Sequence, residues 1–122
     1  MTTLAAGFIA NPVGYNASPL TVTQQSNRAT GVTIHGYSGA ITTNTASLAA
    51  EASAVFTVTN SFVAIGDVVL LAQRSGKVAL NTQAEVTAVA NGSFDITVIN
   101  NNVAAGTAET GAIIINFVVI KA

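Results

Sequence analysis

The chain has 122 residues, of which 50% are hydrophobic and only 7% are charged, and its formal net charge is −1. It has no cysteine, which excludes disulfides, thiolate metal sites and cysteine nucleophiles. No basic surplus and no membrane-length apolar run occurs, so neither nucleic acid nor a membrane is an expected partner. Soluble domains usually carry about a quarter charged residues. We therefore expect other protein to cover much of this surface.

Residues 1–19 mix small residues with both prolines of the chain, Pro12 and Pro19. Because proline fixes φ and removes a backbone donor, neither a helix nor a central strand is expected here. The segment also lacks the basic residues that open a secretory signal, so we expect synthesis and use without processing. We interpret residues 1–19 as an extended N-terminal arm that packs on another protein, with a disordered terminus as the alternative. The apolar side chains expected to make this contact are Phe8, Ile9 and Val13.

From Leu20 onward, short stretches rich in β-formers alternate with turn residues, which is typical of an all-β domain. Residues 45–53 are the only helix-compatible stretch. Asn91-Gly92 predicts a two-residue hairpin, because both positions tolerate positive φ. The pattern predicts an antiparallel β-sandwich over residues 20–122, jelly-roll-like in topology, with a small barrel as the alternative. The expected strands are 20–24, 31–35, 40–44, 54–59, 67–72, 85–90, 93–99 and 112–120.

The final expected strand is apolar on both faces. Its first face consists of Ile113, Ile115, Phe117 and Val119, and its second of Ile114, Val118 and Ile120 around Asn116. A sheet with one solvated face should instead alternate apolar with polar residues. The second face is therefore expected to be a subunit interface or part of the core between two sheets. Residues 67–72 are also continuously apolar, which predicts a strand covered on both faces.

No catalytic, metal or cofactor motif is present. His35 is the only histidine, and no nucleophile elbow or phosphate loop accompanies it. The five acidic residues are solitary, without zinc or calcium spacing. We therefore expect a protein that is not an enzyme and that holds no metal or cofactor. Tyr37, in a loop, is the candidate for a glycan contact.

Several ordered segments resemble structural proteins of tailed-phage virions, a group that includes capsid decoration (cement) proteins and β-rich domains of head and tail fibres. The likeness extends over about residues 21–122. The segments that carry it are TQQSNRATGVTI at 23–34, GAIT at 39–42, FTVTNS at 56–61 followed by Asp67-Val68-Val69, and GAIIINFVVIK at 111–121.

The resemblance implies a β domain that forms a homotrimer on the outer capsid surface and bridges neighbouring major capsid protein subunits. Fibre proteins carry such a module after a longer chain, whereas here only a short segment precedes it, which favours decoration. We thus expect a virion protein made in the host cytoplasm, with Phe8, Ile9 and Val13 on the capsid and Ile114, Val118 and Ile120 at the subunit interface. The alternative is a receptor- or glycan-binding module of a phage head or tail fibre, using loop residues such as Tyr37.

Overall fold

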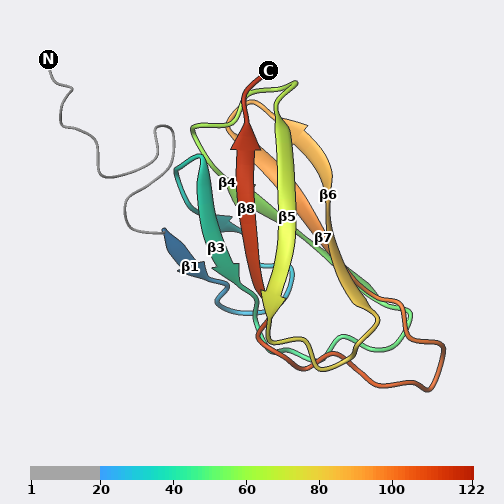
Figure 1. The fold of residues 1–122 in the computed structure, drawn as a ribbon. Coiled ribbons are helices and arrows are strands. Elements are labelled where there is room, and N and C mark those ends of the chain that lie inside the picture. Colours follow the sequence, from blue (N-terminus) through green and yellow to red (C-terminus); the bar gives the residue numbers. More distant parts are fainter. Residues whose placement is uncertain (1–19) are drawn as a thin grey trace, which may run out of the picture.

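The computed structural model describes residues 20–122, which form eight strands and no helix (Figure 1). The all-β prediction is thereby confirmed. The predicted arm, residues 1–19 with Phe8, Ile9 and Val13, lies outside the described residues. The strands are β1 (Thr21–Thr23), β2 (Val32–Thr33), β3 (Ser38–Thr42), β4 (Ser53–Thr59), β5 (Val68–Ser75), β6 (Thr82–Ala90), β7 (Ser93–Asn100) and β8 (Ile114–Ile120).

The strands form two four-stranded sheets that enclose the core as a β-sandwich. Sheet A has the strand order β1-β3-β8-β5, and sheet B has the order β2-β4-β7-β6. In Figure 1, the strands of sheet A lie in front of β4, β7 and β6. Each sheet therefore has an inner face toward the other sheet and an outer face away from it.

Both sheets are mixed, whereas the sequence predicted an antiparallel sandwich. β1 pairs parallel with β3, and β2 pairs parallel with β4, whereas the other pairs are antiparallel. Parallel neighbours need a connection that leaves the sheet. Here the first four strands alternate between the two sheets. The chain therefore forms β2 in sheet B between β1 and β3 of sheet A, and β3 in sheet A between β2 and β4 of sheet B, so the two strands of each pair run in the same direction. The predicted hairpin joins β6 to β7, and Gly92 has a φ of 83°.

The core consists of alternate residues of the strands, as the period-2 geometry of a strand requires. Phe56 and Val58 of β4 face Ile115 and Phe117 of β8 from the opposite sheet, and all four are buried. The ring of Phe94 in β7 lies 5.5 Å from that of Phe117, centroid to centroid. Burying these side chains contributes about 25 cal/mol for each Å² of apolar surface removed from water.

β5 differs from its expected environment. A strand covered on both faces was predicted for residues 67–72, but β5 is an edge strand of sheet A. Val69 points into the core and is buried, whereas Val68 and Leu70 on the outer face are exposed. The continuous apolar sequence therefore reflects one buried and one open apolar face.

The connections gather at the two ends of the sandwich. We call one the Asp67 end, which comprises residues 34–37, 60–67, 91–92 and 121–122. The other is the Glu109 end, which comprises residues 24–31, 43–52, 76–81 and 101–113. The stretch expected to be helix-compatible, 45–53, lies mostly in a loop of the Glu109 end and enters β4 at Ser53.

Candidate functional site

The three residues predicted for a subunit interface share the outer face of sheet A. Along β8, Ile115, Phe117 and Val119 are buried in the core, while Ile114 and Val118 are half-buried and Ile120 is exposed. The prediction of two apolar faces on the last strand is confirmed. Of the two predicted environments for Ile114, Val118 and Ile120, the core between the sheets is excluded, because these side chains point away from sheet B.

β5 extends this apolar outer face, whereas β3 and β1 add the small or polar residues Ala40, Ser38, Thr42, Thr21 and Thr23 to it. β5 places Val68 beside Ile120 and Leu70 beside Val118, and β3 places Ala40 beside Asn116. Of all the residues in the four strands of sheet A, only Arg74 is charged, and it lies where a bulge interrupts the end of β5. Contiguous exposed apolar surface of this kind marks an interaction site more often than a solvated wall.

A shallow, open hollow of about 170 Å³ lies on sheet A between β5 and β8. Its walls are mainly apolar. The residues that line it are Leu70, Leu71, Ala72, Asn116, Phe117 and Val118. The hollow therefore coincides with the centre of the apolar outer face.

The outer face of sheet B has the opposite character. Thr57 donates a hydrogen bond to Asp95 Oδ1 at 2.7 Å, and the hydroxyls of Thr87 and Thr97 lie 2.8 Å apart. These cross-strand pairs satisfy one another and the solvent, as on an ordinary solvated sheet. Val55 is the exposed large aliphatic residue of this face.

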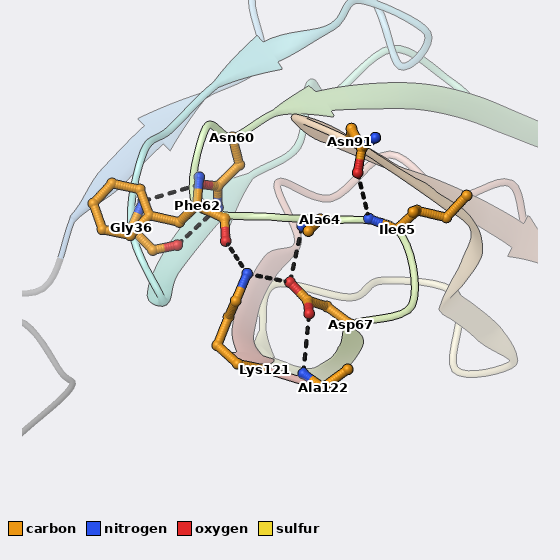
Figure 2. Close-up of polar contacts among 9 residues, drawn as sticks. All are labelled: Gly36, Asn60, Phe62, Ala64, Ile65, Asp67, Asn91, Lys121 and Ala122. Carbon is orange, nitrogen blue, oxygen red and sulfur yellow. Dashed lines mark hydrogen bonds and ion pairs between the residues drawn. The ribbon is translucent and has the colours of Figure 1, made fainter.

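The Asp67 end is fastened by a carboxylate (Figure 2). Asp67 accepts hydrogen bonds from the backbone N–H of Ala64 at 2.8 Å and of Ala122 at 3.1 Å, and it forms an ion pair with Lys121. Lys121 also donates to the carbonyl oxygen of Phe62 at 2.8 Å. The hydrogen bond from Lys121, followed by those from Ala64 and Ala122, lowers the pKa of Asp67 to about 2. The carboxylate thus ties the chain after β8 to the turn before β5.

Side-chain amides hold the loops around this carboxylate. Asn60 is fully buried; its Oδ1 accepts from the N–H groups of Gly36 and Phe62, and its Nδ2 donates to the carbonyl of Gly36. Asn91 Oδ1 accepts from the N–H of Ile65 at 2.8 Å. Figure 2 shows these contacts from three separate loops meeting at one end. The exposed side chains of Phe62 and Ile65 are therefore carried by a fixed backbone.

Tyr37, the predicted glycan contact, lies at the same end. Its ring packs edge-on against Phe62, with centroids 4.8 Å apart, and the residue is half-buried against the core. Nearby, His35 Nδ1 accepts a hydrogen bond from the N–H of Ser61 at 3.0 Å, a structural role at the end of β2. Tyr37 as a glycan contact stays a prediction.

The Glu109 end holds charged residues that the sequence pattern did not single out. Arg28, which is buried, donates to the carbonyl oxygens of Glu109 at 3.2 Å and Gly111 at 3.0 Å. The Glu109 carboxylate accepts from the N–H groups of Val78, Ala79 and Gly111 at 2.8 to 2.9 Å. Burial opposes ionisation of Glu109, but these hydrogen bonds keep its pKa below the usual value. The result is a buried polar network that joins four loops.

This network positions apolar side chains at the surface. Val78, next to the N–H groups bound by Glu109, is exposed, as is Leu80 in the same loop. Val103 is exposed in the loop that precedes Glu109, where the buried Asn100 amide donates to the carbonyl of Thr107. The Glu109 end is thus a second place where apolar groups meet water on a fixed backbone.

Within residues 20–122, no three His, Asp or Glu side chains gather closely enough to hold a metal ion. Nor does this part of the chain form a helix long and apolar enough to cross a membrane. The features that stand out are therefore surfaces, among them the outer face of sheet A.

Comparisons with known proteins give no further guidance: neither protein-family models nor curated proteins nor solved structures match this chain.

Proposed function

We propose that this chain is a non-enzymatic structural protein of a tailed-phage virion: a capsid decoration protein, homotrimeric and jelly-roll-like, that binds the outer capsid surface. The observation that carries the proposal is the apolar outer face of sheet A, in which only Arg74 is charged. A protein that works alone in solution gains nothing from such a face and risks aggregation through it. The resemblance of the sequence to virion proteins supplies the assembly in which the face is covered.

The proposed mechanism is thermodynamic linkage. Decoration binds the assembled shell and not the free subunits, so it shifts the assembly equilibrium toward the shell by mass action. Each contact contributes about 25 cal/mol per Å² of apolar surface, of which ordering costs offset a part. A sandwich whose loops are fixed at both ends limits that ordering cost. Repetition over the shell then stabilises it against the pressure of packaged DNA.

Contact with the major capsid protein is assigned to residues outside the outer face of sheet A. Phe8, Ile9 and Val13 of the predicted N-terminal arm remain the first candidates. The exposed aliphatic residues of the Glu109 end, Val78 and Leu80, are a second apolar surface suited to this contact. Two separate surfaces would allow one protein to bind both its own copies and the shell.

The test is co-sedimentation with empty shells assembled from the major capsid protein of the same phage. The full chain should pellet with shells at a saturating stoichiometry and raise their melting temperature. A chain lacking residues 2–18 should bind more weakly; unchanged binding would remove the arm from the capsid contact. No binding to shells, together with saturable binding of the isolated protein to glycans, would instead establish the alternative of a glycan-binding module.

A further inference from the structure

One polar side chain interrupts the apolar centre of the outer face of sheet A. Asn116 lies in the middle of β8 between Ile114 and Val118, and it is half-buried. The strand register places a small residue on each side of it, Ala40 on β3 and Ala72 on β5. Among residues 20–122, its side-chain amide has no hydrogen-bond partner. The amide therefore sits in a low point of the face with its donor and acceptor both unused.

We infer that the outer faces of sheet A pack together around the symmetry axis of the proposed trimer, so that further copies of this chain cover each face, with Asn116 setting the register. This rests on the proposed function only in its trimeric state and in requiring that protein covers the face. An amide carries a donor and an acceptor, so copies of Asn116 that meet near a symmetry axis satisfy one another. A single polar residue within an apolar interface is a known way to fix alignment between identical chains.

The distribution of charge favours a second copy over a different partner. Contact between identical faces brings like charges together, which is unfavourable unless the face is neutral. The strands of sheet A satisfy this condition except at Arg74, at the far end of β5. The outer face of sheet B does not, because it presents Glu85 and Asp95. Only one of the two faces is thus suited to self-association, which favours a closed assembly over an open stack.

The hollow beside Asn116 supplies a place for an apolar group of the second copy. Its volume of about 170 Å³ is similar to that of an apolar cavity of about 150 Å³ that binds benzene. One aliphatic side chain therefore fits. Leu70 borders the hollow and is 50% exposed, so the second copy's equivalent side chain is the natural occupant.

The decisive experiment measures the solution mass of matched variants by light scattering over a wide dilution range. Leu70 and Val55 are 50% and 48% exposed, on the outer faces of sheets A and B. Leu70→Lys should weaken association about 100-fold or more and give the 12.2 kDa monomer. Val55→Lys should keep the mass of the unmodified chain. If circular dichroism shows that Leu70→Lys does not fold, Ile120→Lys on the same face replaces it.

Asn116→Asp tests the role of the amide. At pH 7 the carboxylates would meet near the axis and dissociate the assembly, whereas at pH 4 their protonation should restore it, because burial and mutual repulsion raise their pKa. Thr59→Asp, on the exposed outer face of sheet B, is the matched control and should have no effect at either pH. Asn116→Leu should still associate but with a broader mass distribution. Association of Asn116→Asp equal to that of Thr59→Asp at pH 7 would overturn the register role.

Self-association and capsid decoration are separated by measuring both for each variant. If Leu70→Lys keeps the mass of the unmodified chain but no longer pellets with shells, the face binds the shell; the inference fails and the proposed function stands. A full chain that is monomeric at every concentration also overturns the inference, whatever its affinity for shells. An assembly that Leu70→Lys disrupts, in a protein that never binds shells, supports the inference and removes the proposed function.

Discussion

Each end of the sandwich is organised by one buried carboxylate that accepts backbone N–H groups, but the partners of the two carboxylates differ in their exposure to water. The side chain of Asp67 is only 3% exposed, but its partner Lys121 has a side chain that is 46% exposed. Glu109 is 0% exposed, and its three donors are backbone N–H groups. Water reaches Lys121 at the Asp67 end, whereas Glu109 and the N–H groups of Ala79 and Gly111 that it accepts from are buried. A carboxylate that accepts backbone N–H groups should therefore contribute more to the free energy of unfolding at the Glu109 end, where its partners are more buried.

The two carboxylates also hold different parts of the chain in place. Asp67 joins Ala122, at the end of the chain, to a turn of four residues. Glu109 and Arg28 join loops that display the exposed aliphatic residues Val78 and Leu80. Loss of the buried network should thus affect a candidate capsid-binding surface as well as stability.

The largest effect is expected for Glu109→Ala. The substitution leaves three N–H groups without an acceptor, two of them buried, and Arg28 without a nearby negative charge, which should reduce the free energy of unfolding by about 3–5 kcal/mol. Glu85→Ala, an exposed carboxylate on β6, is the control and should change it by less than about 0.5 kcal/mol. Urea denaturation at pH 7 measures both. Equal effects of the two substitutions would show that burial is not what distinguishes Glu109.

Replacing a glycine by alanine should also cost more stability at the Glu109 end than at the Asp67 end. A Cβ on Gly111 would lie 1.9 Å from the carbonyl oxygen of Gly76, so Gly111→Ala should cost about 3 kcal/mol as the two backbones separate. Gly66, at the Asp67 end, has a φ of +93° but open space around it, so Gly66→Ala should cost only the strain of that φ, about 1 kcal/mol. The urea midpoints of the two variants give the comparison. A larger cost for Gly66→Ala would reverse the ranking of the ends.

Strand alternation explains which parts of the fold were predictable. The period of two assigned Ile115, Phe117 and Val119 to one face of the last strand and Ile114 to the other, as observed. Asn91-Gly92 likewise predicted its hairpin from a local property, although only Gly92 of the two adopts the positive φ that both tolerate. The parallel pairs β1–β3 and β2–β4 were missed, because direction depends on which sheet each intervening strand joins. No local pattern encodes that choice.

The buried charges were unpredictable for the same reason. Glu109 meets the N–H of Val78 across 31 positions, and Arg28 meets the carbonyl of Glu109 across 81. In sequence, both are isolated polar residues in loops and are indistinguishable from the exposed Glu85. The candidate interface was predictable only as far as its chemistry: alternation placed Ile114, Val118 and Ile120 together, but not at an outer face.

A smaller, pH-dependent effect is expected at the Asp67 end. Because the pKa of Asp67 is lowered from 3.8 to about 2, its contribution to stability is complete above about pH 4 and is lost as pH falls toward 2. Asp67→Asn should therefore be less stable than the unmodified chain at pH 7, with a difference that shrinks between pH 4 and pH 2. Urea denaturation across this range measures the difference. A constant difference would mean that the charge of Asp67 contributes nothing.

The smallest effect is expected for Lys121→Ala. Removing the half-exposed ammonium breaks the ion pair with Asp67 and the bond to the Phe62 carbonyl, but Asp67 keeps the N–H donors of Ala64 and Ala122, so the cost should be about 0.5 kcal/mol. Lys77→Ala is the control at the other end, since Lys77 also donates to a carbonyl, that of Thr82 at 3.1 Å. Added salt should reduce the effect of Lys121→Ala by screening the ion pair. A cost near that of Glu109→Ala would mean that both ends contribute equally to the free energy of unfolding, and that exposure of the partners does not decide their contribution.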